Sequence, residues 1–154
     1  MVARKPNILI VMVDQLAPAF LPIHGHRIVK APNVEALAKT GVVFDSAYCN
    51  SPLCSPSRAV FMTGQLPSRS GVYDNAAEFS ADIPTYAHHL RNLGYRTVLS
   101  GKMHFCGPDQ LHGFEERLVG CDALGLDSGF ADAAVVHETV SPEEDKGMAL
   151  LNSN

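Results

Sequence analysis

The chain has 154 residues, of which 46% are hydrophobic and 18% charged, and its formal net charge at pH 7 is −4. This length suits one ordinary domain, and the composition is that of a globular protein with a core, which excludes a disordered or repetitive chain. The mild negative charge and the absence of a Lys/Arg cluster from the sequence argue against a nucleic-acid partner.

The first recognisable element is an apolar run at residues 7–13. The run is far too short for a membrane span, which takes about 20 residues. Arg4 and Lys5 precede it as in a secretory signal, but Asp14 follows at once and no small-residue cleavage site appears. We therefore expect a strand buried on both faces of a parallel sheet, no membrane partner, and a cytoplasmic location.

Helices and strands alternate in the next hundred residues. We predict helices at residues 32–39, 56–63 and 84–93, each closed by a glycine, and strands at residues 42–44 and 95–99. Strand, helix, strand, helix, strand is the order of α/β proteins.

The amino-acid composition changes after residue 118, where Asp, Gly and Ala dominate and an acidic run follows. We expect residues 1–118 to form one unit. Residues 119–154 have no assignable role in a sheet, and we expect a divergent tail that is disordered or misread.

The four cysteines are an even number, but the chain is neither small nor rich in cysteine. Their spacings contain no C-x-x-C pair, which argues against a structural zinc site. Without an export signal, free thiols are expected rather than a disulfide framework.

Asp14 stands where the first strand should end. Ligands of open α/β sheets gather at the carboxyl ends of strands, so Asp14 is a candidate binding residue. A plain turn-capping role fits its position equally well.

Cys54 directly precedes a helix whose first turn is expected to begin at Pro56. Unpaired N–H groups and the helix dipole favour negative charge there, and Arg58 adds a guanidinium suited to an oxyanion. These residues indicate a site for an anionic group. They leave open whether Cys54 is a reactive thiolate or a buried structural cysteine, and cysteine phosphatases separate Cys from Arg by five residues rather than three.

Two longer stretches carry a family resemblance. Residues 54–64, CSPSRAVFMTG, resemble the first signature of the type I sulfatases, and residues 94–104, GYRTVLSGKMH, resemble the second. Both stand in the family's order, after an Asp at the end of the first strand. The resemblance implies an alkaline-phosphatase-like α/β fold, with a mostly parallel sheet flanked by helices.

The resemblance also implies a nucleophile. In this family the motif cysteine, here Cys54, is oxidised by a dedicated maturation enzyme to formylglycine, whose hydrate attacks the sulfur of a sulfate ester and later expels sulfate. Arg58 would steady the hydrate, Lys102 would contact the sulfate oxygens, and His104 would be a proton-transfer partner. The alternative for Lys102 and His104 is a solvated loop.

A divalent cation is implied as cofactor, usually Ca²⁺, with Mn²⁺ and Mg²⁺ as other choices. Asp14 would be a ligand from the first strand, with Gln15 and the modified Cys54 beside it. Many members of the family have a second Asp where this chain has Gln15, whose carbonyl can ligate a cation but brings no charge.

Further stretches resemble the choline-sulfatase branch of the family and imply choline sulfate as the small-molecule substrate. They are residues 13–16, 65–69, 72–78, 85–90, 101–104 and 107–118. Asn75 is the additional candidate, because its amide could bind sulfate. The other interpretation of Asn75 is a turn residue after Asp74.

Two other functions stay open, namely a phosphonate or phosphate monoester hydrolase on the same scaffold and a non-catalytic remnant. The resemblance implies a complete enzyme several times longer, with further metal ligands in its second half. We therefore expect this chain to be an amino-terminal fragment, inactive and poorly stable alone. A homo-oligomeric complete enzyme also stays open.

Overall fold

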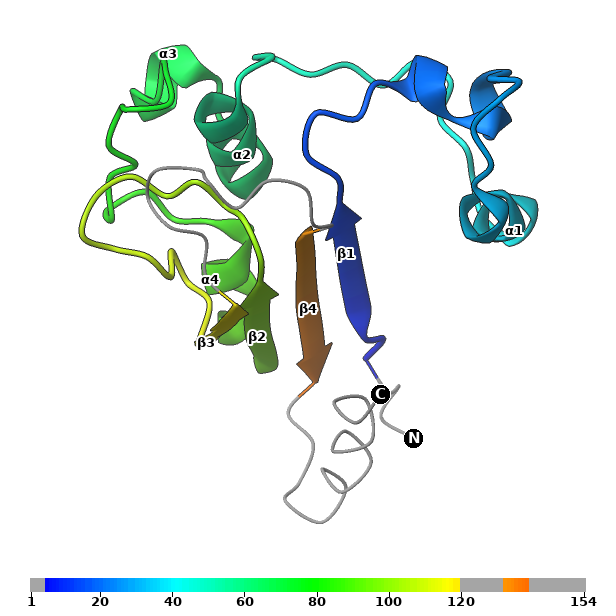
Figure 1. The fold of residues 1–154 in the computed structure, drawn as a ribbon. Helices are drawn as coiled ribbons and strands as arrows, with labels where there is room; N and C mark the ends of the chain where they lie inside the picture. The colour runs from blue at the N-terminus through cyan, green and yellow to red at the C-terminus, as the bar shows by residue number, and fades with distance from the viewer. Residues whose placement is uncertain (1–4, 120–131, 139–154) are drawn as a thin grey trace.

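A four-stranded sheet organises the described residues. The computed structural model describes residues 5–119 and the backbone of residues 132–138. The spatial order of the strands is β1–β4–β2–β3, with β1 at Ile8–Met12, β2 at Tyr95–Ser100, β3 at Glu116–Val119 and β4 at Asp132–Glu138. β4 runs antiparallel to both of its neighbours, and β3 runs parallel to β2. β1, β2 and β3 therefore point the same way and end at one edge of the sheet (Figure 1).

β4 lies in the stretch for which the sequence predicts no strand. Its backbone pairs with β1 from Ile8↔Val136 to Met12↔Asp132 and with β2 from Tyr95↔Glu138 to Ser100↔Ala133. It is thus the strand that joins β1 to β2. Residues 120–131 and 139–154 of the expected tail lie outside the described residues, and the division of the chain at residue 118 stays a prediction.

In the part of the chain that the structure describes, four helices accompany the sheet: α1 (Pro32–Thr40), α2 (Cys54–Thr63), α3 (Pro67–Ser70) and α4 (Tyr86–Asn92). Two 3-10 turns, Pro18–Phe20 and Pro22–His24, precede α1. The helices predicted from the sequence are confirmed, with boundaries shifted by a few residues. α2 begins at Cys54 rather than Pro56, because a proline in the first helical turn gives up an N–H that has no partner within the helix.

The strand predicted at residues 42–44 is wrong. This segment is irregular, and Val42 and Phe44 are among the most exposed apolar residues described. A run rich in β-branched and aromatic residues forms a strand only where another strand pairs with it. No such partner lies beside residues 42–44 in the described sheet.

The core lies between β2, α2 and α4. Its buried apolar side chains are Ala59, Met62, Val72, Phe79, Ala87, Leu99, Met103, Phe105 and Phe114. Figure 1 shows α2 near the carboxyl edge of the strands and α4 alongside β2. Thr85 begins α4 with a capping box, in which its side chain and that of His88 satisfy each other's backbone N–H groups.

β1 is covered on one face only, which corrects the expectation of burial on both faces. Ile10 packs against the core, whereas Leu9 is 64% and Val11 60% exposed. The alternation follows from the strand geometry, because successive side chains point to opposite sides of the sheet.

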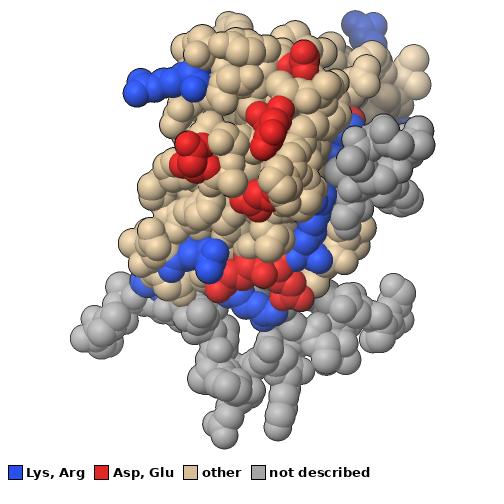
Figure 2. Space-filling model, turned by 90° about the vertical axis from the view of Figure 1, so that its left-hand side faces the viewer, with Lys and Arg blue, Asp and Glu red and all other residues tan. Residues whose placement is uncertain are grey.

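The surface beside α3, α4 and β3 carries charges of both signs. Figure 2 shows acidic and basic side chains interspersed on this face, over a largely uncharged background. Two ion pairs fasten α4 and β2 to the segment around β3: Arg91 to Glu115 at 3.9 Å and Arg96 to Glu116 at 2.7 Å. On this face, the described residues form no broad surface of a single sign.

Candidate active site

Three chain segments converge at the carboxyl edge of the sheet. β1 ends at Met12 and Asp14 follows, while β2 ends at Ser100 and Lys102 follows. Because these strands are parallel, Asp14 and Lys102 reach the same edge. Cys54 is the first helical residue of α2 and lies beside them, since the Lys102 Nζ is 3.7 Å from the Cys54 Sγ.

Asp14 accepts two charged hydrogen bonds. Its Oδ1 accepts from the Arg58 Nη2 and its Oδ2 from the Lys102 Nζ, each at 2.9 Å. The side chain of Arg58 is 3% exposed, that of Lys102 13%, and that of Asp14 30%. Arg58 also donates through Nη1 to the backbone carbonyl of Lys102, so one buried guanidinium ties the two loops together.

These contacts favour the charged forms of Asp14 and Lys102. Burial acts to raise the pKa of Asp14, but the hydrogen bonds from Lys102 and Arg58 outweigh it, and the pKa lies below its usual value. Burial acts to lower the pKa of Lys102, but the hydrogen bond to Asp14 and the charge of the nearby Cys54 outweigh it, so that the pKa is raised. Two cations and one carboxylate leave a net charge of one positive unit beside the Cys54 sulfur, which suits an anionic ligand.

The side chain of Asn75 binds the backbone at the start of α2. Its Oδ1 accepts the backbone N–H of Ser55 at 3.0 Å, so one of the helix N–H groups expected to face an anion is already taken. The turn-residue interpretation applies instead to Asp74, whose Oδ1 accepts the N–H groups of Ala76 and Ala77 at 2.8 Å. The positive charge of the site therefore comes chiefly from Arg58 and Lys102.

His104 lies behind Asn75. Its Nε2 is 2.9 Å from the Asn75 carbonyl oxygen, and its buried Nδ1 has no hydrogen-bond partner among the described residues. The contact with a carbonyl requires that Nε2 carry the proton. The structure thus brings His104 to the site through the backbone of Asn75, and Cys106 donates to the same carbonyl at 3.2 Å.

An open pocket of about 630 Å³ gives access to these groups. Of the candidates, Asp14, Gln15, Cys54, Arg58 and Asn75 line it, together with apolar side chains such as Leu16 and Phe61. Lys102 and His104 are not among the lining residues. They contact two of the lining residues, Lys102 at the Cys54 sulfur and His104 at the Asn75 carbonyl.

Backbone strain gathers around the site. Among the described residues, the non-glycine residues with left-handed backbone are Gln15 (φ 54°), His104 (φ 52°) and His112 (φ 41°). Such conformations cost energy and persist where the surrounding structure enforces them, often at functional positions. Two of the three are site residues predicted from the sequence.

The third, His112, was not predicted from the sequence. Its side chain is fully buried, stacked on Phe79 at 4.0 Å between ring centroids and edge-on to Phe105 at 4.5 Å. The Nδ1 is 3.6 Å from the Asp109 Oδ2, too long for a hydrogen bond, so neither ring nitrogen has a hydrogen-bond partner among the described residues. No sequence pattern marks this histidine, because its role arises from packing.

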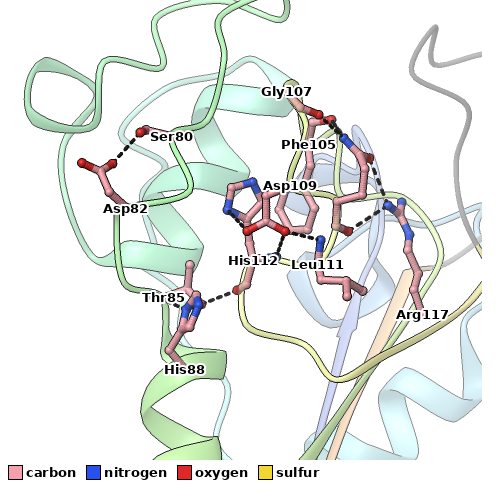
Figure 3. A network of polar contacts seen from close by, with 11 residues as sticks. Ser80, Asp82, Thr85, His88, Phe105, Gly107, Asp109, Leu111, His112 and Arg117 are labelled. Carbon is pink, nitrogen blue, oxygen red and sulfur yellow. Dashed lines mark hydrogen bonds and ion pairs between the residues drawn. The ribbon is translucent and has the colours of Figure 1, made fainter.

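His112 joins the two loops that carry Asn75 and His104. The Thr85 Oγ1 donates to the His112 carbonyl at 2.6 Å, and Asp109 accepts the His112 N–H at 3.0 Å (Figure 3). The Phe79 N–H donates to the Cys106 carbonyl at 2.9 Å, beside the stacked rings. These contacts fix the segment of Asn75 against the segment of His104.

The described residues supply only some of the oxygen ligands that a divalent cation would need. The carboxylate of Asp14 and the amide carbonyl of Gln15 are oxygen ligands of the kind that Ca²⁺ and Mg²⁺ accept, but such ions take six or more ligands. The described residues contain no group of three or more His, Cys, Asp or Glu side chains placed to hold a metal. The described site therefore supplies a minority of the ligands.

No helix in the described part of the chain has the length and hydrophobicity needed to cross a membrane.

A cysteine at a helix start, flanked by an Arg–Asp–Lys cluster at the carboxyl edge of an α/β sheet, is the arrangement expected from the two signatures. The sulfatase family model matches residues 6–147, and the chain belongs to the sulfatase family. It is 64% identical over 118 residues to the choline-sulfatase of Rhizobium meliloti (strain 1021), which covers 77% of this chain and 23% of that enzyme. It is 35% identical over 133 residues to the steryl-sulfatase of Homo sapiens, covering 73% and 23% of the two chains.

Solved structures confirm the expected fold class. The structure of a protein in complex with its substrate D-glucosamine-2-N,6-O-disulfate matches with a TM-score of 0.64 at 26% identity, over 87% of this chain and 28% of that chain. The chain is thus of the alkaline-phosphatase-like α/β class, and it spans about a quarter of the length of the relatives that it matches.

Proposed function

We propose that this chain forms the nucleophile-bearing part of a sulfuric ester hydrolase. The observation that carries the proposal is the position of Cys54, at the first residue of α2 with an ammonium 3.7 Å from its sulfur. The Arg58–Asp14–Lys102 cluster behind it carries one net positive charge. A sulfate ester brings one negative charge to that place.

The proposed nucleophile is formylglycine, made from Cys54 by a maturation enzyme. Its hydrate would supply two oxygens on one carbon, one to attack sulfur and one to drive release of sulfate. A divalent cation, with Ca²⁺ as first choice, would be held in part by Asp14 and Gln15 and would supply charge stabilisation.

The residues of this chain would do the remaining work. Lys102 would place its ammonium against the sulfate oxygens, since its Nζ already reaches both Cys54 and Asp14. Arg58 would hold Asp14 and the Lys102 loop in place through its buried guanidinium. His104 would move a proton at Nδ1, because its Nε2 is used to bind the Asn75 carbonyl.

For the substrate we propose choline sulfate. The support is the 64% identity to the choline-sulfatase of Rhizobium meliloti over 118 residues. The described pocket is lined by Arg58 and Asn75, which would bind the anionic end of such a molecule. The cationic end would need aromatic faces or carboxylates, which the lining residues supply only through Phe61 and Asp14.

The first experiment is mass spectrometry of the peptide that contains Cys54, after co-expression with a formylglycine-generating enzyme. We expect a fraction of the chains to carry the aldehyde in place of the thiol. A thiol retained in all chains under those conditions would remove the proposed nucleophile.

The second experiment uses the longer protein that contains this chain. Lys102→Ala and His104→Ala should each lower kcat by about 10²–10⁴-fold, the range of lost oxyanion stabilisation or proton transfer. Lys39→Ala, in the exposed helix α1, is the matched control and should leave kcat unchanged. Near-normal kcat in both site variants would contradict the assigned roles, and a preference for an aryl phosphonate monoester over choline sulfate would favour the alternative hydrolase.

A further inference from the structure

A second thiol shares the pocket with Cys54. Cys49 lines the same pocket, and its Sγ lies 3.1 Å from the Oγ of Ser57. Ser57 follows Cys54 by three residues on α2. Residues three apart on a helix are neighbours on one face, with Cβ atoms about 5–6 Å apart, so the Cys49 thiol lies alongside the helix face that carries Cys54.

The segment that carries Cys49 is suited to a small movement. Every described residue from 41 to 50 is exposed, and no helix or strand holds this stretch. The other contact of the Cys49 sulfur is with the backbone carbonyl of Ser51, within the same loop. Bringing the Cys49 sulfur into bonding distance of the Cys54 sulfur therefore disturbs no buried packing.

Cys54 is the thiol of the pair that has a cation beside it. The Lys102 ammonium is 3.7 Å from its sulfur, where it can stabilise negative charge that develops as the sulfur reacts. The thiolate is the form that attacks peroxides and disulfides. The Cys49 sulfur contacts the Ser51 carbonyl and the Ser57 hydroxyl, and Cys49 would act as the resolving thiol.

We propose that Cys49 and Cys54 form a reversible redox pair, in which a Cys49–Cys54 disulfide withholds Cys54 from conversion to formylglycine. Formation of the disulfide does not depend on the proposed function. The block of the conversion of Cys54 to formylglycine, called the withholding step below, rests on it.

The oxidant is a peroxide such as hydrogen peroxide. The Cys54 thiolate attacks one peroxide oxygen, the O–O bond breaks, and the departing hydroxide takes a proton to become water, leaving a sulfenic acid. The Cys49 thiol attacks that sulfur, the S–S bond forms, the S–O bond breaks, and a second water leaves. The two sulfurs together lose two electrons to the peroxide, and a low-molecular-weight thiol reverses the change by exchange.

The test needs only the 154-residue chain and hydrogen peroxide. Trypsin cleaves after Lys39 and Arg58, so one peptide, residues 40–58, contains Cys49 and Cys54 and no other cysteine. After peroxide treatment and alkylation without reduction, this peptide should be two hydrogens lighter than the reduced form and carry no alkyl group. Reduction before alkylation should restore two alkylated cysteines.

Matched variants separate the pair from general thiol oxidation. In Cys49→Ser, Cys54 should stop at the sulfenic acid, which dimedone traps, whereas Cys106→Ser should still form the disulfide. A wild-type peptide that remains doubly alkylated, or Cys54 sulfenic acid at equal yield with and without Cys49, would overturn the proposal. Repeating the reaction in urea checks the role of the fold, since the disulfide should then form more slowly.

The consequence for maturation is measured separately. Oxidised chain presented to a formylglycine-generating enzyme should yield less aldehyde than reduced chain, and treatment of the oxidised chain with a low-molecular-weight thiol should restore the yield. Equal aldehyde yield from oxidised and reduced chain would refute the withholding step. If the disulfide forms but reduced chain never yields aldehyde, the proposed function fails while the redox pair stands.

Discussion

Residues 5–54 and residues 55–119 differ sharply in how they are packed. No described side chain in the first region is buried, and α1 contains no buried residue, whereas every member of the buried core comes from the second region. Yet the first region supplies Asp14 and Cys54, and the second supplies Arg58 and Lys102. The candidate site lies where the two regions meet.

This difference shows what holds the site together. Arg58 is buried in the packed region. It donates hydrogen bonds to Asp14 through Nη2 and to the backbone carbonyl of Lys102 through Nη1. Asp14 follows a strand that is covered on one face only. Its position therefore depends on charged hydrogen bonds to the packed region rather than on burial of its own segment.

The largest expected effect comes from deleting a core side chain. Phe114 is 1% exposed, and Phe114→Ala should lower the free energy of unfolding by about 3–5 kcal/mol. Leu37 in α1 is 72% exposed, and Leu37→Ala should change the free energy of unfolding by less than about 0.5 kcal/mol. Urea unfolding followed by circular dichroism measures both, and equal losses would show that residues 5–54 are packed as tightly as the rest.

Two glycines, one in each region, show the same difference in packing. Gly25 (φ 95°) and Gly113 (φ 97°) share a left-handed backbone, but a Cβ at Gly25 would meet nothing within 4 Å, whereas one at Gly113 would lie 2.7 Å from the His88 backbone nitrogen. Gly25→Ala should cost about 1–2 kcal/mol from backbone strain alone. Gly113→Ala should lower the free energy of unfolding by about 1–3 kcal/mol more than Gly25→Ala does, because of overpacking. Thermal unfolding of the two variants measures the difference.

The smallest expected effect is a pH dependence within the packed region. Burial lowers the pKa of His112, an effect that nearby His88 adds to and the Asp109 carboxylate opposes. The unfolded chain, with an ordinary histidine pKa near ~6.5, then binds more protons than the folded chain as pH falls below that value. Stability should therefore decrease as pH falls below about 6.5, by at most about 1.4 kcal/mol per pH unit for one proton.

His112→Phe isolates this contribution, because it keeps an aromatic ring against Phe79 and Phe105 and removes the titrating group. Unfolding free energies of the variant and the wild type between pH 7 and pH 5 give the comparison. An unchanged slope in the variant would assign the dependence to other groups.

The chemistry-bearing residues were predictable because they stand in local patterns. The site residues Asp14, Cys54, Arg58 and Lys102 follow from a strand end and two signatures, and the structure brings them within hydrogen-bonding reach. Helix positions followed equally well from the closing glycines and the apolar spacing.

The parts that sequence reasoning missed depend on partners distant in the chain. The run at residues 42–44 has strand composition, but no described strand pairs with it. Among the described residues, none covers the face of β1 that carries Leu9 and Val11. β4 is composed of residues that show no strand pattern strong enough to predict, yet it pairs along its length with β1 and β2. His112 is defined by rings that come from residues 79 and 105.

The position of β4 in the sheet also sets the distance between the ends of β1 and β2. Because it lies between β1 and β2, the ends of those two strands are two ladder spacings apart, roughly 9.6 Å at about 4.8 Å each. Asp14 has a short side chain, so most of this gap must be crossed from the other side, by the four-carbon arm of Lys102. The width of one interposed strand thus acts as a spacer that requires a long, flexible amine opposite a short carboxylate.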